Sequence, residues 1–322
     1  MKARIIATGS YYPDIVVTNH DLEKIMDTND EWIVQRTGIK ERRFSNYNTS
    51  YMAHQSALDV LKNANIDKDE IDLIIVATFT PDNLSPSCAN DVAKMLDLKK
   101  DIPSFDINAA CSGFIYGLKV TQALIESDMY ETILLIGSEN ISKILNFEDR
   151  GSSILFGDGA GSAIIKADET GIIDTMIANK NDSKKAIVAG NGIDIETPFT
   201  SNKEIEKNYV QMNGQEVFKF ATSVFVKSLK EITKKNNLTF DDIKYIVPHQ
   251  ANLRIIDFAI KMLKIEKEKF IVNLDKVGNT SAASVPIALD ELNKQGKLQK
   301  GDKIILVAFG SGLTYGASLI EW

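Results

Sequence analysis

Cysteine is scarce in this chain of 322 residues, which contains only Cys88 and Cys111. No Cys-x-x-Cys pair occurs, and no cysteine and histidine residues have the spacing of a zinc site. The sequence therefore predicts neither structural disulfides nor a bound metal. For Cys88 we expect the role of a small buried apolar side chain.

Positive charge is also in short supply. Lysine and arginine total 37 against 44 acidic residues, and the formal net charge is −7. A nucleic acid or an anionic membrane would need a basic surface, so we expect neither as a partner. No apolar run approaches the roughly 18 residues of a membrane span, and the N-terminal residues lack the features of a secretory signal. We expect a cytoplasmic protein.

What the chain does contain is a series of short, unbroken apolar runs of strand length. Continuous runs indicate strands covered on both faces, with helices between them, which is the pattern of an α/β protein. The predicted strands lie within residues 71–78, 132–137, 162–165, 245–247 and 303–309.

The two halves of the chain resemble each other. Residues 71–76 match 243–247, and residues 131–137 match 302–308, at offsets close to 172 residues. A duplicated fold is the simplest account, although short apolar strands also match by chance. We expect halves at 1–170 and 171–322 that pack as one body. The polar stretch from residue 168 to about 210 should carry surface loops and the crossover.

Cys111 follows an apolar strand and opens a helix that is apolar nearly all round, a pattern typical of a helix buried in the middle of a domain. A thiol attacks as its thiolate, and a helix N-terminus stabilises negative charge. We therefore expect Cys111 to be an activated nucleophile at the floor of a narrow pocket.

Two further polar positions could complete a site. His249 follows a strand and a proline, so it should lie at the sheet edge where α/β proteins bind ligands; His20 and His54 are expected to be solvated or structural. Asn279 lies in Gly-Asn-Thr-Ser before a predicted helix at 282–292. We expect Thr280 or Ser281 to cap that helix, and the Asn279 amide to donate a hydrogen bond into the site.

Two glycine-rich segments, at 156–161 and 309–313, invite a nucleotide-loop interpretation. Neither shows the strand, Gly-x-Gly-x-x-Gly and helix order of such loops, so we expect tight turns in hairpins. The backbone N–H groups of Ser311 and Cys111 could together form an oxyanion hole.

With Cys111, His249 and Asn279 in these contexts, the chain resembles β-ketoacyl-acyl-carrier-protein synthase III, the initiating condensing enzyme of fatty acid synthesis in the thiolase superfamily. The resemblance covers the whole chain and is carried by residues 9–13, 30–39, 149–151, 156–161, 247–254 and 278–286. It implies a duplicated αβαβα fold of five layers and a homodimer.

The resemblance also implies a reaction in two stages. Cys111 would take an acyl group from an acyl-CoA, with the oxyanion held by the backbone of Cys111 and Ser311. Malonyl-acyl-carrier protein would then lose carbon dioxide, and its enolate would accept hydrogen bonds from His249 and Asn279 before attacking the acyl group. No cofactor is implied, and coenzyme A enters only as the thioester substrate.

Further residues take roles from the same resemblance. Coenzyme A would meet Trp32, Arg36 and Arg150. Ser85 stands where acetyl-selective relatives commonly carry phenylalanine, so we expect starters larger than acetyl to be accepted. The carrier protein, an acidic partner, would dock on a stretch that includes Gln250, Ala251, Asn252, Leu253, Arg254 and Lys261.

Several alternatives stay open. The nearest is a related condensing enzyme or acyltransferase of secondary metabolism, and another is a hydroxymethylglutaryl-CoA synthase, which should carry a catalytic glutamate in its N-terminal half. A cysteine hydrolase would need a side chain that orients the histidine and would need water access. A binding protein without catalysis belongs to a different class, and acylation of Cys111 would exclude it.

Overall fold

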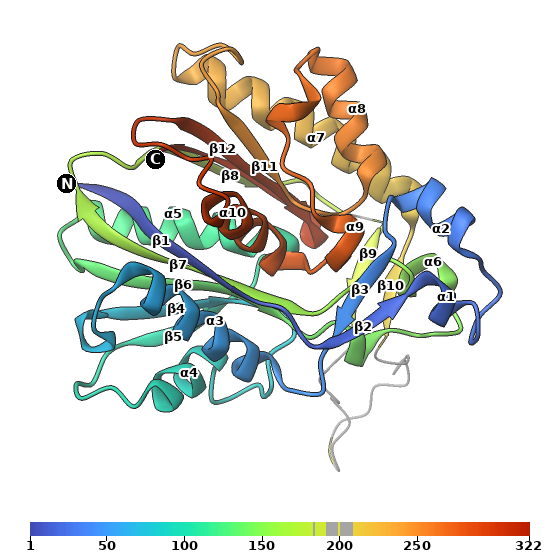
Figure 1. The fold of residues 1–322 in the computed structure, drawn as a ribbon, viewed down its shortest axis with the longest axis horizontal. Helices are drawn as coiled ribbons and strands as arrows, with labels where there is room; N and C mark the ends of the chain where they lie inside the picture. The colour runs from blue at the N-terminus through green and yellow to red at the C-terminus, as the bar shows by residue number, and fades with distance from the viewer. Residues whose placement is uncertain (183, 191–198, 200–208) are drawn as a thin grey trace.

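Two open sheets with helices between them and on both outer faces make up the computed structural model (Figure 1). It describes residues 1–182, 184–190, 199 and 209–322. The predicted strands form as expected, and the architecture is the predicted five-layer α/β fold. Among the described residues, no helix combines the length and the apolar character needed to cross a membrane.

The first sheet belongs to the first half of the chain. Its strand order is β1-β7-β6-β4-β5, with β4 parallel to β5 and β6, and with β7 antiparallel to β1 and β6. Every residue of β4 and β6 is buried, as their unbroken apolar runs indicated. The bounds are β1 Lys2–Tyr11, β4 Leu73–Ala77, β5 Ser104–Ile107, β6 Thr132–Glu139 and β7 Gly159–Asp168.

The second sheet repeats this plan with one strand fewer. Its order is β11-β12-β13-β8, where β11 and β12 are parallel and the other pairs antiparallel. β6 begins at residue 132 and β12 at residue 303, an offset of 171. The bounds are β8 Ile172–Asn179, β11 Tyr245–Pro248, β12 Lys303–Gly310 and β13 Thr314–Glu321. The predicted boundary after residue 170 falls between β7 and β8.

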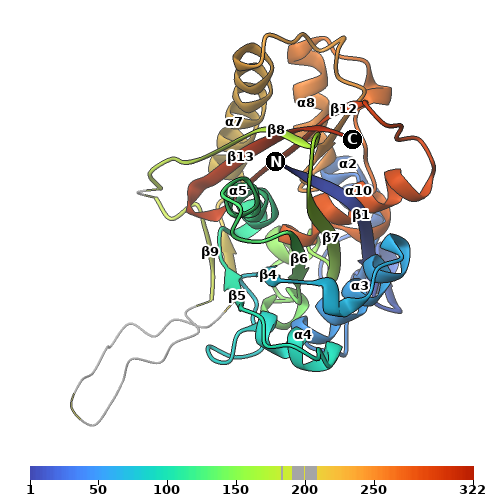
Figure 2. The ribbon, with the colours of Figure 1, turned by 90° about the vertical axis from the view of Figure 1, so that its left-hand side faces the viewer.

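The helices form three layers (Figures 1 and 2). The first outer layer, α3 Thr49–Ala64 and α4 Cys88–Leu96, covers the first sheet. The second outer layer, α7 Gly214–Lys235 and α8 Leu253–Leu263, covers the second sheet. Between the sheets lie α5 Gly113–Glu126 and α10 Ser284–Lys294, whose apolar side chains pack against strands of both sheets.

Shorter elements surround the end of the molecule where the central helices begin. Two small ribbons pair β2 Ile15–Thr18 with β3 Glu41–Phe44 and β9 Ile187–Ala189 with β10 Val210–Met212. The short helices are α1 Asn19–Leu22, α2 Asp30–Thr37, α6 Arg150–Ser153 and α9 Leu274–Val277, and the 3-10 turns are η1 Lys68–Glu70, η2 Ala110–Ser112, η3 Ser142–Ile144, η4 Lys267–Lys269, η5 Ser281–Ala283 and η6 Ser311–Leu313.

Two expectations about the connections were wrong. The stretch from residue 168 to 210, partly outside the described residues, contains β8, an edge strand in which Asp174 and Thr175 interrupt the apolar residues, so it shows no long continuous apolar run. The glycines at 159 and 161 lie in strand β7 and not in a tight turn. A Cβ on Gly161 would lie 2.6 Å from the backbone nitrogen of Ile287, so glycine lets α10 approach this strand. The second glycine-rich segment does join the β12–β13 hairpin.

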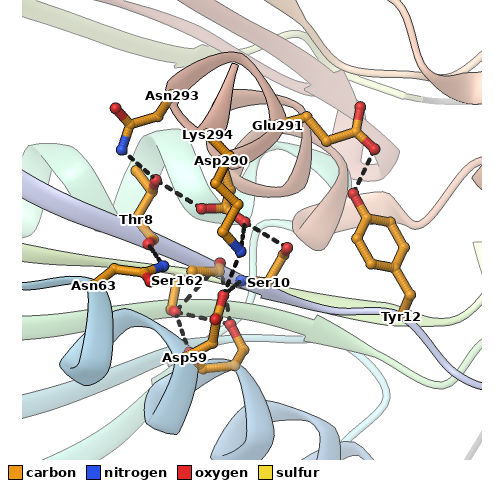
Figure 3. A network of polar contacts seen from close by, with 12 residues as sticks. Thr8, Ser10, Tyr12, Asp59, Asn63, Ser162, Asp290, Glu291, Asn293 and Lys294 are labelled. Carbon is orange, nitrogen blue, oxygen red and sulfur yellow. Dashed lines mark hydrogen bonds and ion pairs between the residues drawn. The ribbon is translucent and has the colours of Figure 1, made fainter. Parts of the chain in front are cut away.

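A polar network fixes α10 to the first sheet (Figure 3). The buried carboxylate of Asp290 accepts hydrogen bonds from Thr8 at 2.8 Å and Ser10 at 2.5 Å, both on β1. Lys294, one turn further along α10, contacts Asp290 at 2.8 Å and Asp59 of α3 at 2.6 Å. The network therefore ties the central layer to the outer layer through the edge of the sheet.

We expect Asp290→Ala to lower the free energy of unfolding by about 2–3 kcal/mol, because the buried hydroxyl of Thr8 and the partly buried hydroxyl of Ser10 lose their acceptor. Urea denaturation followed by circular dichroism measures the change. Asp257→Ala on the exposed face of α8 is the control, with an expected change within about 0.5 kcal/mol. Equal stabilities of the two variants would contradict the role given to this network.

Candidate active site

Cys111, His249 and Asn279 line one cavity of about 890 Å³. Cys111 lies in η2 just before α5, His249 follows β11, and Asn279 precedes η5 and α10. The structure thus brings the three predicted residues together from both halves of the chain. They meet where the two central helices begin.

Cys111 is held by a tight turn. Ala110 adopts a left-handed backbone with φ of 48°, a conformation uncommon for a residue with a side chain, and α5 starts two residues after Cys111. The side chain is only 8% exposed, and its Sγ accepts a hydrogen bond from Ser281 Oγ at 3.2 Å. Burial raises the pKa of the thiol to about 12. Loss of hydration thus opposes the thiolate that the helix N-terminus was expected to favour, and the role of Cys111 as an activated nucleophile stays a prediction.

His249 is buried and neutral. Its Nδ1 lies 2.6 Å from Ser284 Oγ, which also accepts from the Gln250 backbone N–H at 3.5 Å. We assign Ser284 as the donor to Nδ1, which places the ring proton of His249 on Nε2. Burial lowers the pKa of His249 to about 3, so the ring stays uncharged at neutral pH. A neutral imidazole of this tautomer donates a hydrogen bond from Nε2.

Asn279 is oriented by its own turn. Its Oδ1 accepts from the backbone N–H of Ser281 at 2.9 Å, which turns the Nδ2 group of the amide the other way. The expected capping by Thr280 or Ser281 was wrong. Neither η5 nor α10 has a side-chain cap, because the Ser281 hydroxyl contacts Cys111 instead.

The end of β12 supports the cysteine from the other half. A Cβ on Gly310 would lie 2.7 Å from the backbone nitrogen of Cys111, so only glycine fits this approach. Ser311 lines the cavity, and its hydroxyl donates to the Ile187 carbonyl at 2.7 Å, which directs the side chain toward β9. The hydrogen bond to Ile187 therefore fixes the direction of the Ser311 side chain.

The cavity opens beside an aromatic and cationic group. Trp32 and Arg36 line it, as does Gly151, the neighbour of Arg150. The guanidinium carbons of Arg36 and Arg150 lie 4.6 and 4.8 Å from the centre of the Trp32 ring. The three residues that the resemblance assigned to coenzyme A thus form one cluster at the mouth.

Comparison with known proteins agrees with this geometry. The family model for the 3-oxoacyl-[acyl-carrier-protein (ACP)] synthase III matches residues 105–181, and the model for its C-terminal part matches residues 233–322. A beta-ketoacyl-[acyl-carrier-protein] synthase III from Clostridium novyi is 50% identical over 323 residues, covering 100% of this chain and 99% of the relative. The chain belongs to the synthase III family.

Solved structures of synthase III proteins have the same fold. The enzyme from Aquifex aeolicus aligns with a TM-score of 0.92 at 42% identity over 99% of this chain and 100% of its own. The priming β-ketosynthase of the R1128 polyketide pathway aligns with a TM-score of 0.91 at 30% identity, covering 99% and 96% of the two chains. The fold thus also serves a polyketide enzyme.

The predicted carrier-protein contacts of synthase III need one correction. Gln250 is fully buried, where its amide donates to the carbonyls of Pro248 at 2.7 Å and Ile271 at 3.0 Å. It cannot meet a partner, because these contacts hold the loop after β11 in place. The other predicted residues are partly or fully exposed: Ala251, Asn252, Leu253, Arg254 and Lys261. Of these, Asn252 caps α8 by accepting from the Arg254 N–H at 2.9 Å.

Ser85 also departs from its prediction. It is exposed in the loop before α4 and does not line the cavity of its own chain. The loop is held next to β5 by the start of α4. Asp106 of β5 accepts hydrogen bonds from the backbone N–H groups of Cys88 and Ala89, the first two residues of α4, both at 2.8 Å. Cys88 itself is buried in an apolar cluster, as expected.

Sequence reasoning missed three polar residues around Cys111 and His249. Ser284 orients the histidine ring, Ser281 contacts the cysteine, and Glu139 lies fully buried at the end of β6. The only sequence signal for any of them was that Glu139 is an acidic residue at the end of an apolar strand.

Within the described residues, no group of three or more His, Cys, Asp or Glu side chains could hold a metal ion.

We expect Gly310→Ala to displace Cys111, because the new Cβ would meet backbone atoms that cannot turn aside. The expected cost is about 1–3 kcal/mol of unfolding free energy, together with a slower reaction of Cys111 with iodoacetamide. The stability control is Gly214→Ala, where no atom lies within 4 Å of the added carbon. Unchanged stability and thiol reactivity in Gly310→Ala would contradict the close approach of β12.

Proposed function

We propose that this chain catalyses the decarboxylating condensation of an acyl-CoA with malonyl-acyl-carrier protein. The product is 3-oxoacyl-acyl-carrier protein, which initiates fatty acid synthesis. The observation that carries the proposal is the convergence of Cys111, His249 and Asn279 on one cavity in a member of the synthase III family.

In the first stage the Cys111 sulfur attacks the acyl carbon of the acyl-CoA. The carbon–sulfur bond to coenzyme A breaks, and an acyl-Cys111 thioester remains. The backbone N–H groups of Cys111 and Ser311 would hold the oxyanion. Both residues line the cavity, and Gly310, the neighbour of Ser311, lies directly against the backbone of Cys111. Trp32, Arg36 and Arg150 would bind the nucleotide end of coenzyme A at the mouth.

In the second stage malonyl-carrier protein loses carbon dioxide. The electron pair of the broken carbon–carbon bond becomes an enolate, whose oxygen would accept hydrogen bonds from His249 Nε2 and Asn279 Nδ2. Neutral donors suit this task, because they stabilise the developing charge and keep their protons. The enolate carbon then attacks acyl-Cys111 and expels the Cys111 thiolate, which takes up a proton from water to restore the resting thiol. The reaction transfers no net electrons, so it needs no redox cofactor.

The acyl-carrier protein would dock beside the cavity mouth. Arg254 lies at the cavity and Lys261 is exposed on the same helix, α8. Asn252 reaches across to the Arg36 carbonyl at 3.0 Å, which joins this helix to the coenzyme A cluster. An acidic carrier would thus meet cations next to the opening that its prosthetic arm must enter.

A condensing enzyme of secondary metabolism is the second candidate, favoured by the 30% identity to the R1128 priming ketosynthase. The acceptor separates the two functions. Condensation with the carrier protein of fatty acid synthesis supports the first, and transfer only to a polyketide carrier or a small molecule supports the second.

We expect Cys111→Ala to abolish product formation, and His249→Ala and Asn279→Ala to lower condensation by about 10²–10³-fold while Cys111 is still acylated. Purified protein, malonyl-carrier protein and a panel of acyl-CoA starters are assayed by carbon dioxide release and product mass. Exclusion of propionyl and butyryl starters would contradict the expectation that starters larger than acetyl are accepted. Product formation by Cys111→Ala would contradict the acyl-enzyme.

A homodimer paired along β5 is the proposed assembly. This strand ends the first sheet, and its edge has no neighbouring strand among the described residues. Phe105 on it is 37% exposed, and Leu84 in the adjoining loop is 77% exposed. Unpaired edges readily join a second copy, and twofold pairing would bring the loop that carries Ser85 to the partner. Ser85 could then shape an acyl pocket only across that interface.

We expect the wild type to sediment at about twice 35.7 kDa and Phe105→Lys to shift it toward the monomer, because a buried lysine would face the interface uncompensated. Analytical ultracentrifugation measures both. Met262→Lys, at a position 53% exposed on α8, is the control and should remain dimeric. A monomeric wild type would contradict the assembly.

A further inference from the structure

The proposed reaction leaves one buried acid without a role. Glu139 ends β6 with no exposed surface. Its carboxylate accepts hydrogen bonds from the hydroxyls of Thr80 at 2.5 Å and Thr78 at 3.1 Å, and from the backbone N–H of Phe79 and Thr80, both at 3.2 Å. Donors that converge in this way hold a carboxylate in its charged form. Burial acts in the opposite direction and raises the pKa of Glu139 to about 8.

Ser281 connects this acid to the nucleophile. A hydrogen bond with the Ser281 side chain is one of the influences that lower the pKa of Glu139, against the larger effect of burial, and Ser281 Oγ lies 3.2 Å from Cys111 Sγ. The hydroxyl has one hydrogen and can direct it either way. It can donate to the Glu139 carboxylate while accepting from the Cys111 thiol, or donate to a thiolate while accepting from a protonated acid.

The surrounding turns keep the three groups together. A Cβ on Gly137 of β6 would lie 2.3 Å from the Ala282 carbonyl oxygen, so η5 rests directly on the strand that carries Glu139. Ser281 has a left-handed backbone with φ of 50°, a conformation that a serine adopts only where its surroundings impose it. The packing of the two halves therefore holds Ser281 beside Cys111 and close to the strand that carries Glu139.

We propose that Cys111 loses its proton through Ser281 to Glu139 as it attacks the acyl-CoA. This proposal rests on the function proposed above. The S–H bond of Cys111 breaks as Ser281 Oγ takes the proton, and the Ser281 hydrogen moves to a Glu139 oxygen. When the coenzyme A sulfur leaves with its electron pair, the proton returns through Ser281 to it. Glu139 is thus restored, and the products are acyl-Cys111 and coenzyme A thiol.

Few other charges bear on this proton path. His249 lines the same cavity but is neutral. Asp158, next to the Gly159 that pairs with Glu139 in the sheet, is bonded to Ser142 at 2.6 Å and to the Ser45 N–H at 2.9 Å. Within the described part of the chain, no lysine or arginine forms an ion pair with Glu139. The negative charge of Glu139 itself disfavours a Cys111 thiolate. If the Glu139 carboxylate only repelled the thiolate and took no proton, it would slow the reaction.

The two roles of Glu139 therefore predict opposite effects of its removal: loss of a proton acceptor slows acylation of Cys111, whereas loss of a repelling charge speeds it. We compare the single-turnover rate of Cys111 acylation by acetyl-CoA from pH 6 to 10 in wild type, Glu139→Gln and Ser281→Ala. Proton transfer predicts a wild-type rate that levels off above pH 8, losses of about 10- to 100-fold in both variants near pH 8, and no further loss in the double variant. A Glu139→Gln rate equal to or above that of the wild type overturns the proposal.

Three controls distinguish a failure of this proton path from a failure of the proposed function and from unfolding of a variant. Ser162→Ala removes another buried hydroxyl, which donates to the Ser56 carbonyl at 2.8 Å and is not among the residues that line the cavity, and should keep the wild-type pH profile. If acetyl-CoA acylates no variant, alkylation of Cys111 by iodoacetamide over the same pH range replaces it, with the same losses expected. If Glu139→Gln does not fold, a Ser281→Ala rate within twofold of the wild type overturns the proposal.

Discussion

The active site depends on two places where the backbone of one half of the chain packs against a glycine of the other half. The turn that carries Cys111 lies against Gly310 of the second sheet, and the turn that carries Ser281 lies against Gly137 of the first. At both places a Cβ would overlap backbone atoms, so each turn packs directly on the backbone of the other half. Close packing of this kind holds reacting groups more firmly than loops could. The duplicated fold is therefore the means by which the site is assembled.

Burial then sets the chemistry. The cavity removes water from Cys111 and His249, so the resting site contains a thiol and an uncharged imidazole. A neutral ring suits hydrogen bonding to an enolate, whereas a neutral thiol must lose its proton before or during attack. The site thus gains a stable donor and also needs a proton acceptor. Glu139 is the buried carboxylate placed to be that acceptor.

Much of this arrangement could be predicted from the sequence, because local patterns carry it. Unbroken apolar runs predicted the buried strands, and residues at strand ends predicted Cys111 and His249. The strand β8 was missed because Asp174 and Thr175 divide its apolar residues into two short groups. Ser281 was interpreted as a cap, since a serine before a helix usually is one. Its true partners, Cys111 and Glu139, lie 170 and 142 positions away, and no local pattern reports such contacts.

Burial of individual side chains was equally hard to predict. Gln250 stands beside His249 in a segment that resembles a docking surface, yet its amide holds the loop together inside the protein. The raised pKa of Cys111 has the same origin, because the loss of hydration depends on elements from both halves. Residue type and position along a strand could not supply either fact.

The most direct test of the account is to locate the acyl group after acyl-CoA alone is added to the His249→Ala protein. Peptide mapping by mass spectrometry distinguishes Cys111 from Cys88, and both thiols are buried with pKa values raised to about 12. The account predicts an acyl group on Cys111 and none on Cys88, because only Cys111 lines the cavity. An acyl group on Cys88, or on neither cysteine, would contradict it.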